Sequence, residues 1–489
     1  MPITASMLYD LVQCPHRLTL DLRGDQGQRD TPNPFVQMLW KRGTLYEDEI
    51  VANLKEPFLD LSAWAGTDLE LRTAQAIERK EPLIYGGRIA ADNLVGEPDL
   101  LRLRGDKYIA ADIKSGSGYE GDEDDGKLKK HYAVQLALYT DILERKGLSA
   151  DRTPYILDIH GDEVTYRLDE PVGTRNPITM WAFYKQALAT AEKIAAAETE
   201  TLPASSAKCG LCHWYSACLE DLKNRDDLTL IPELGRPKRD AMYHAVPTMG
   251  DLAAADLSIF ANGKKSIFKG IGLETIDKFQ RRARLIKENG KPYLTAPVNL
   301  PVSEVELFFD IEVDPMRDFC YLHGFVERRQ GDSSNERYHA FFADATDGAL
   351  EEKAFRQAVE FIRERSPCAV YYYSKYERTW WRKLQQRYPT VCSADEINDL
   401  FDPQRSVDLY LDVVKCSTEW PTSDHSIKTL AKYLGFDWRD THPSGAASIE
   451  WFDRWINEQN PEMRQRILGY NEDDCRATRV LLDGIRSLQ

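Results

Sequence analysis

Two aspartates and a lysine stand close together in the run GEPDLLRLRGDKYIAADIKSG, at Asp99, Asp112 and Lys114. Residues 94–103 and 107–113 are rich in apolar and β-branched residues and predict two strands joined by a tight turn. This hairpin would bring Asp99 close to Asp112, and alternation along the strand would put Lys114 on the same face as Asp112. Two carboxylates that hold a divalent cation, with a lysine that orients water, suit metal-assisted phosphodiester hydrolysis. The spacing alone is equally typical of a charged surface hairpin.

A helical pattern and a group of cysteines accompany this hairpin. In HYAVQLALYTDIL, Gln135 and Tyr139 lie four residues apart and share one face of the expected helix. A C-x2-C-x5-C pattern downstream and one cysteine in QCPHR near the N-terminus frame the region: Cys14, Cys209, Cys212 and Cys218. Core packing does not select such clustering, which indicates a metal centre. Four thiolates bind zinc or an iron–sulfur cubane, and the spacing leaves both open.

In this order the motifs resemble those of the RecB-like nucleases of the PD-(D/E)xK superfamily, over about residues 1–225. The likeness is greatest to the iron–sulfur branch that includes AddB and the CRISPR-adaptation exonucleases. The resemblance implies that Asp99 and Asp112 hold metal, that Lys114 activates water, and that the helix carries the family's QxxxY pair. It also implies that the four cysteines hold a structural 4Fe-4S cluster, with zinc as the less favoured alternative.

One position departs from the family pattern. Many relatives carry a histidine after the first helices, where this chain has RGTLYEDE and offers Glu47. A carboxylate also binds a hard cation, so we expect Glu47 to assist the metal site with an altered metal preference.

A second acidic motif opens the C-terminal third, in EVELFFDIEVDP. Alternation puts Asp310 and Glu312 on one face of the expected strand and apolar residues on the other. Two acids side by side on an apolar strand are costly unless a cation neutralises them. The closing helix carries ILGYNEDDCRATRVLLDGI, where Tyr470 and Asp474 share a face, and the helical register favours Asp474 over Asp473.

Between these motifs the pattern predicts strands at CYLHGFVER, RYHAFFADA and CAVYYYS, and helices at about 349–364 and at KYERTWWRKLQQRY. This layout resembles the RNase H-like fold of DnaQ-type exonucleases, and more closely its YprB-like branch. The resemblance implies that Asp310, Glu312 and Asp474 hold metal and that Tyr470 orients the attacking water. The family has an aspartate in its second motif, where this chain offers Glu377, in SKYERTWW. Asp408, in RSVDLYLDVV, is a further candidate acid.

A basic segment lies between the two motif regions. Residues 264–291 carry nine lysines and arginines against three acidic residues. Within it, FKGIGLETIDKFQRRARL resembles a helix–hairpin–helix element, whose GIG turn offers backbone N–H groups to a phosphate. We expect non-specific contact with a nucleic-acid backbone, the alternative being a solvated helical linker. The expected contacts are Lys264, Lys265, Lys269, Gly270, Gly272, Lys278, Arg281 and Arg282.

The composition bounds the class of protein. The chain has 489 residues, 42% hydrophobic and 29% charged, which is typical of a globular protein with two or three domains. No apolar run has the length of a membrane span, and no signal pattern precedes the first motif, so we expect a cytoplasmic protein. The formal charge of −16 argues against a histone-like role. No P-loop motif occurs, so we expect any helicase partner to be separately encoded.

The sequence therefore predicts a mixed α/β protein of three parts. These are a PD-(D/E)xK restriction-endonuclease-like domain, a basic helical connector and an RNase H-like domain, at 1–226, 227–300 and 301–489. The expected activity is Mg²⁺- or Mn²⁺-dependent hydrolysis of DNA, and the family resemblance favours single strands or ends. Three alternatives stay open: only the first site is active and the C-terminal domain binds nucleic acid, the substrate is RNA, or the chain is a non-catalytic DNA-binding scaffold.

Overall fold

The computed structural model describes residues 1–120, 126–173, 177–263, 265–441 and 443–489. The chain divides into two compact units, which we describe separately. Unit 1 comprises Met1–Pro203 and Ala207–Cys218, and unit 2 comprises Ala204–Ser206 and Leu219–Gln489. The segment expected as a connector falls in unit 2, so its status as a separate domain stays a prediction. None of the described helices is long and apolar enough to cross a membrane.

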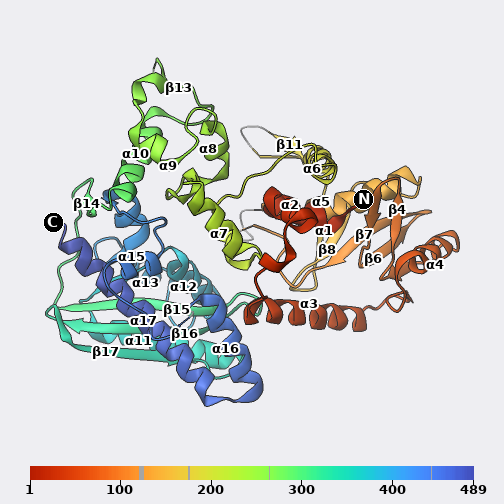
Figure 1. The fold of residues 1–489 in the computed structure, drawn as a ribbon. Coiled ribbons are helices and arrows are strands. Elements are labelled where there is room, and N and C mark those ends of the chain that lie inside the picture. The colour runs from red at the N-terminus through yellow and green to blue at the C-terminus, as the bar shows by residue number, and fades with distance from the viewer. Residues whose placement is uncertain (121–125, 174–176, 264, 442) are drawn as a thin grey trace. The chain divides into compact units, whose positions relative to one another are not determined.

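Unit 1 is built on a six-stranded mixed sheet in the order β2-β3-β6-β7-β8-β9. Its strands are β2 (Leu59–Asp60), β3 (Leu83–Tyr85), β6 (Leu100–Arg104), β7 (Lys107–Ile113), β8 (Tyr155–Leu157) and β9 (Glu163–Thr165). The helices are α1 (Ala5–Gln13), α2 (Pro15–Arg23), α3 (Pro34–Ala52), α4 (Gly66–Glu78), α5 (Lys130–Arg145) and α6 (Met180–Ala195). Apolar residues of α1, α2, α5 and α6 pack on one face of the sheet, and α3 packs on the other (Figure 1).

The first predicted strand is wrong in its extent. The stretch 94–103 forms two strands, β5 (Leu94–Gly96) and β6, and β5 joins a separate three-stranded sheet with β1 (Ile3–Thr4) and β4 (Ile89–Ala91). Pro98 lies at the break, because proline lacks the N–H that a ladder needs. The second strand and the tight turn lie where they were predicted, and Gly105 supplies the left-handed conformation of the turn with φ of 68°.

The C-terminal part of unit 2 holds a five-stranded sheet in the order β17-β16-β15-β18-β19. Its strands are β15 (Val305–Asp314), β16 (Phe319–Arg329), β17 (Asp332–Phe342), β18 (Ala369–Tyr372) and β19 (Ser406–Asp408). The first three are antiparallel neighbours, whereas β18 is parallel to β15 and to β19. The sheet is therefore mixed, with antiparallel and parallel pairs.

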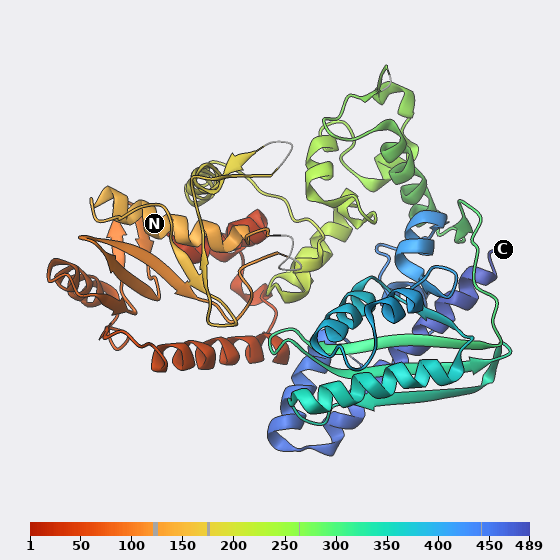
Figure 2. The ribbon, with the colours of Figure 1, turned by 180° about the vertical axis from the view of Figure 1, so that it is seen from behind.

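Helices cover both faces of this sheet. On one face lie α11 (Gly348–Arg365), α12 (Tyr376–Arg387) and α13 (Ala394–Leu400), packed on the odd-numbered residues of β15. On the other lie α15 (Ile427–Tyr433), α16 (Gly445–Glu458) and the long α17 (Pro461–Arg486). Figure 1 shows α17 crossing in front of the sheet, and Figure 2, seen from behind, shows α11 on the opposite face.

The predicted connector is a small helical group with an apolar cluster of its own. Its main helices are α8 (Gly235–Met242), α9 (Met249–Ala254) and α10 (Leu273–Lys287), and Gly272 is the N-cap of α10. After α10 the chain forms β14 (Tyr293–Leu294), which pairs with β20 (Thr418–Glu419) beyond the predicted boundary at 300.

Candidate functional sites

The first site forms at the end of the β6–β7 hairpin. Leu100 pairs with Ala111, and this antiparallel register sets Asp99 beside Asp112. The Asp99 carboxylate accepts a hydrogen bond of 2.6 Å from the backbone N–H of Ile113. The Lys114 ammonium lies 2.8 Å from the Asp112 carboxylate. Strand pairing thus brings the three predicted groups together.

Burial governs the charges of this site. Burial and the neighbouring Asp112 and Glu47 carboxylates together raise the pKa of Asp99 to about 8, against the opposing effect of Lys114. Burial lowers the pKa of the Lys114 ammonium, but the two aspartates outweigh burial and raise it above its usual range. The lysine is therefore held charged beside Asp99, whose ionised form is disfavoured by burial. A bound cation would favour that ionised form.

Two helices supply the other predicted residues. Glu47 of α3 accepts a 2.9 Å hydrogen bond from the Tyr85 hydroxyl, and its charge acts on Asp99. Tyr139 and Gln135 lie on α5, where burial raises the pKa of Tyr139 well above its usual range. A Cβ at Gly96 would lie 2.5 Å from a carbon of the Tyr139 ring, so only glycine lets the ring pack there. The Gln135 side-chain oxygen is buried and has no hydrogen-bond partner among the described residues.

The four cysteines come from the two ends of unit 1. Cys14 stands between α1 and α2, Cys209 lies in a 3-10 helix (Ala207–Leu211), and Cys218 lies in α7 (Tyr215–Asn224). Cys212 closes a tight turn, because its N–H donates to the Cys209 carbonyl over 3.0 Å. Burial raises the pKa of the Cys212 thiol, and Cys14 and Cys209 add to this effect. Thiols are ligands for a soft metal centre, either zinc or a cubane cluster, although among the described residues no three of these sulfur atoms lie within 4.8 Å of one another.

Side-chain contacts hold the two cysteine segments together. Asp21 of α2 accepts hydrogen bonds from His213 at 2.6 Å and from the Trp214 indole at 2.9 Å. Both donors directly follow Cys212 in the chain. These contacts connect the segment that carries the C-terminal cysteines to α2.

The second site lies between β15 and α17. Oxygen atoms of Asp310, Glu312 and Asp474 all lie within 4.8 Å of one another, and among the residues described no other such group of three metal-ligating side chains occurs. The Asn471 amide donates to Asp310 over 2.7 Å, and the Trp438 indole donates to Asp474 over 2.7 Å. The second predicted site is thus a cluster of three acids, in which hydrogen bonds hold the Asp310 and Asp474 carboxylates.

The pKa values of Asp310 and Glu312 are raised. Burial raises the pKa of Asp310 well above its usual range, and the charges of Asp474, Glu312 and Glu377 raise it further. Burial and the charge of Asp474 together raise the pKa of Glu312 to about 8. Buried carboxylates that repel one another favour the binding of a divalent cation, because the cation offsets their negative charge.

Glu377 and Asp408 lie on the neighbouring elements. Glu377 belongs to the first turn of α12 and is 3% exposed, and Asp408 ends β19 and is 2% exposed. One Asp408 oxygen accepts the N–H groups of Ser374, Tyr410 and Leu411 at 3.0 Å each. The Glu377 Oε2 and Asp408 Oδ2 atoms are buried without a hydrogen-bond partner in the described part of the chain. Burial raises the pKa of Glu377 well above its usual range, and Asp408 and Asp474 add to that shift.

Asp473 and Asp474 are separated by the helix register. Asp473 turns to Arg439, whose backbone N–H and guanidinium both donate to it at 2.8 and 2.9 Å. Asp474 belongs to the acidic cluster instead. Asp474, which the helical register predicted as the site residue, is therefore the one that lies beside Asp310.

Comparison with known families decides what these folds are. Residues 22–219 match the family model of the PD-(D/E)XK nuclease superfamily, and residues 307–485 match that of the RNase_H superfamily. The chain joins a PD-(D/E)XK nuclease domain to an RNase H superfamily domain. This confirms the predicted fusion and fold class. No curated protein matches the chain.

In the RNase H domain the sequence did not reveal two polar neighbours of the acids. The Lys428 ammonium donates to the Tyr470 hydroxyl over 2.8 Å and lies 3.9 Å from an Asp474 oxygen. Asn471 fills the space beside Gly324, where a Cβ would lie 1.6 Å from its amide oxygen. Lys428 stands in SIKTLAKY without any motif, so only the fold reveals it, whereas Asn471 is a polar residue next to Tyr470.

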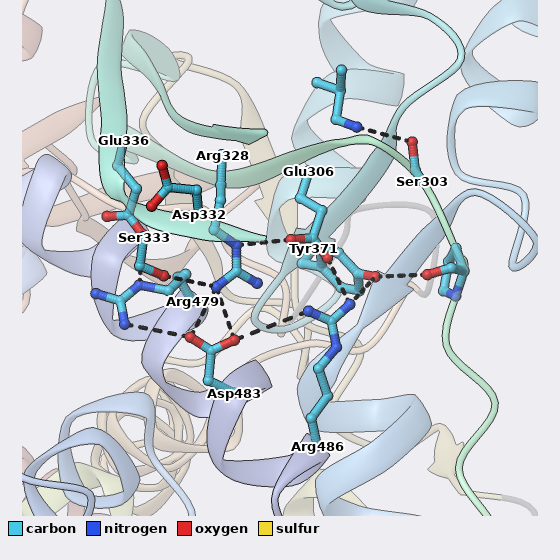
Figure 3. Close-up of polar contacts among 12 residues, drawn as sticks. Ser303, Glu306, Arg328, Asp332, Ser333, Glu336, Tyr371, Arg479, Asp483 and Arg486 are labelled. Carbon is cyan, nitrogen blue, oxygen red and sulfur yellow. Dashed lines mark hydrogen bonds and ion pairs between the residues drawn. The ribbon is translucent and has the colours of Figure 1, made fainter. Parts of the chain in front are cut away.

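A charged network fixes the far half of α17 on the RNase H sheet (Figure 3). Arg328 of β16 is 2% exposed and donates to Glu306 over 2.8 Å and to Asp483 over 2.9 Å. Arg486 reaches the same Glu306 over 2.6 Å. These ion pairs connect the sheet to α17, the helix that carries Tyr470 and Asp474. They therefore help to position these two residues relative to β15.

One predicted nucleic-acid contact of the connector, Arg282, is wrong. Arg282 is fully buried and pairs with Glu419 over 2.6 Å and with Glu233 over 3.0 Å, so a phosphate cannot reach it. The sequence could not predict this, because charge patterning does not reveal which face of α10 is buried.

The other predicted connector contacts differ in their surroundings. Lys265, Lys269, Gly270 and Gly272 are exposed. Lys278 pairs with Glu233 over 2.9 Å, and Arg281 pairs with Asp277 on its own helix. Lys264 lies outside the described residues.

Proposed function

We propose that the protein is a metal-dependent nuclease that hydrolyses DNA phosphodiester bonds, acting on single strands or DNA ends. The observation that carries the proposal is the group formed by Asp310, Glu312 and Asp474, whose oxygens converge within 4.8 Å in a nuclease-superfamily domain. The Asp99, Asp112 and Lys114 cluster supports it from the other domain.

In the first site Asp99 and Asp112 would hold Mg²⁺ or Mn²⁺, with Glu47 assisting from α3. The bound cation would supply a water of lowered pKa and neutralise charge on the phosphate. Lys114, held charged by its aspartate neighbours, orients water and donates to a phosphate oxygen. Gln135 and Tyr139 position these groups from α5.

In the second site Asp310, Glu312 and Asp474 would hold the metal. Glu377, whose charge acts on Asp310, would contribute negative charge, and Asp408 acts in turn on Glu377. Tyr470 orients the attacking water through its hydroxyl. We propose that glutamate replaces the usual aspartate here because Glu377 begins a buried helix turn and keeps one oxygen unpartnered. If Glu377 does not replace the aspartate as a metal ligand, the RNase H domain would bind nucleic acid without cutting it.

DNA is the proposed substrate because the first domain resembles RecB-like nucleases. The connector, with its exposed Lys265 and Lys269, would contact the backbone without sequence preference. RNA and a purely scaffolding role are the alternatives that the test must separate. We propose a cytoplasmic location and, since the chain has no P-loop, a separately encoded helicase as a partner.

We further propose that Cys14, Cys209, Cys212 and Cys218 hold a 4Fe-4S cluster with a structural role. Half-buried thiols from both ends of unit 1 support this, since a centre there would link the first helices to the last. Anaerobic purification followed by iron, sulfide and zinc analysis tests it. Stoichiometric zinc without iron would replace the cluster by a zinc site.

The activity test uses anaerobically purified full-length protein with end-labelled single-stranded DNA, duplex DNA and RNA, in Mg²⁺ or Mn²⁺. Wild type is compared with Lys114→Ala and Asp310→Ala. If each substitution abolishes the cutting of a different substrate, both domains cut. If Asp310→Ala leaves all cleavage intact, the RNase H domain is a binding module. No cleavage by wild type in either metal would reject the nuclease proposal.

A further inference from the structure

A small basic site lies beside Lys114, where the loop after β7 meets the start of α5. The Nζ atoms of Lys114 and Lys129 lie 5.7 and 5.3 Å from the centre of the Tyr132 ring. A Cβ at Gly116 would lie 3.6 Å from the Tyr132 hydroxyl and 3.8 Å from the Lys129 ammonium. Two ammonium groups and a phenol hydroxyl, all hydrogen-bond donors, are therefore gathered around one loop.

The two lysines of this site differ in their partners, because Lys114 pairs with Asp112 over 2.8 Å. Lys129 is half-buried, burial lowers the pKa of its ammonium, and none of the ion pairs among the described residues includes it. The charges of Glu120 and Asp158 raise the pKa of Lys129, but by less than burial lowers it. A half-buried ammonium without a close counter-ion is unfavourable, which indicates that an anion is its missing partner.

The neighbouring histidine reports the same excess of positive charge. The His131 ring lies 4.9 Å from the Tyr9 ring and 4.5 Å from the Tyr132 ring. Burial and the charges of Lys129, Lys208 and Lys114 together lower the pKa of His131 to about 4. The charges of three lysines thus act on the His131 ring, which lies beside the first site.

We propose that Lys129, together with Lys114 and the Tyr132 hydroxyl, binds a backbone phosphate of the nucleic acid adjacent to the bond held at Asp99 and Asp112. The proposal rests on the proposed function only in taking a nucleic acid as the substrate. A phosphate offers several acceptor oxygens and a negative charge, which match two point-like ammonium donors and a hydroxyl donor. Lys114 would then connect the metal-binding acids to the phosphate next to them.

The neighbouring Lys130 provides a matched control. Its ammonium lies 5.3 Å from the Phe183 ring, on a different side of α5, and it is exposed. Removing either lysine changes the net charge of the protein by the same amount. A difference between the two variants therefore reports position and not total charge.

The experiment measures binding of labelled single-stranded and duplex oligonucleotides to the full-length protein without divalent metal, over a range of salt concentrations. We expect Lys129→Ala to weaken binding about tenfold and to flatten the plot of log Kd against log salt by about 0.7 for single strands or about 0.9 for duplex. Lys129→Arg should restore the slope, Tyr132→Phe should weaken binding with the slope retained, and Lys130→Ala should match wild type. Thermal melting checks that each variant is folded.

Cleavage in Mg²⁺ is assayed in parallel, which separates this proposal from the nuclease proposal. If Lys129→Ala leaves affinity and slope unchanged, or changes them no more than Lys130→Ala does, the phosphate site is rejected even where wild type cuts. Wild type that binds no nucleic acid also rejects it. If Lys129→Ala loses affinity while wild type cuts nothing, the phosphate site stands and the nuclease proposal fails.

Discussion

Arg282 of α10 donates to Glu419 of β20 over 2.6 Å, and the two side chains are 0% and 4% exposed. The same guanidinium donates to the Pro232 carbonyl over 2.9 Å. The pair joins the helical connector to the strand next to the RNase H sheet. A charged residue that looked like a nucleic-acid contact therefore holds two parts of unit 2 together.

Removing one partner of this pair should destabilise unit 2. Arg282→Met leaves Glu419 buried without its counter-ion, which costs about 3–5 kcal/mol in the free energy of unfolding. The double variant Arg282→Met with Glu419→Leu removes both charges, and we expect it to recover most of that loss. Urea unfolding of the four proteins of this cycle measures the coupling. Additive effects would show that the pair contributes nothing.

The RNase H acids should make stability depend on pH and metal. The pKa of Glu312 is about 8 in the folded protein, above its unfolded value of about 4.5, so folding favours the protonated form. Its contribution is complete below about pH 4.5 and is lost as the pH rises through 8, with a slope of up to about 1.4 kcal/mol per pH unit. Unfolding from pH 5 to 9 without metal should show this decline.

Two comparisons identify the source of the decline. Mn²⁺ should reduce it, because a bound cation favours the ionised acids. Glu312→Gln should also reduce it, because the amide does not titrate. A metal-free stability that stays level across this range in wild type would contradict the raised pKa.

The neighbouring aspartates of α17 provide a matched pair of variants. Asp474→Asn removes a carboxylate from the acidic group and should reduce Mn²⁺ affinity at the RNase H site by tenfold or more, an order of magnitude estimated from the loss of metal-site contacts. Asp473→Asn should leave Mn²⁺ affinity unchanged, since Asp473 pairs with Arg439. Calorimetric Mn²⁺ titration distinguishes them. Equal losses would mean that general charge, and not the acidic cluster, attracts the metal.

Lys428 should act through Tyr470. As a donor to the phenol oxygen, it leaves the hydroxyl hydrogen of Tyr470 free to point toward Asp474 or a water. We expect Lys428→Met to lower kcat for the substrate of the RNase H site about 10- to 100-fold with little change in KM. Lys428→Arg should recover part of this. If the pH profile of kcat shifts in Lys428→Met and not in Lys428→Arg, Lys428 positions Tyr470. An increase in KM alone would indicate that Lys428 binds substrate instead.

The sequence predicted the elements that carry periodic signals. Alternation placed Asp310 and Glu312 on one face of β15, and the helical period separated Asp474 from Asp473. Both signals are local and follow directly from backbone geometry. The hairpin of Asp99 and Asp112 was found in the same way, although the proline before Asp99 ended the strand earlier than its apolar pattern indicated.

The residues that the sequence missed depend on long-range packing. Lys428 meets Tyr470 only because α15 lies against α17, and Arg282 is buried only because β20 reaches the connector. Neither residue type nor local spacing carries that information. The cysteines are intermediate: clustering predicts a metal centre, but the choice between zinc and a cubane needs chemical analysis.

The two sites differ in the length of chain that each needs. Asp99 and Asp112 are 13 residues apart on one hairpin, whereas Asp310 meets Asn471 across 161 residues. During synthesis the carboxylates of the hairpin can come together as soon as that turn has formed. The acidic cluster of the RNase H domain forms only after α17 has been made and has packed onto its sheet. A ribosome that stops early, or a protease that removes α17, would therefore leave a protein with the first site and without the second.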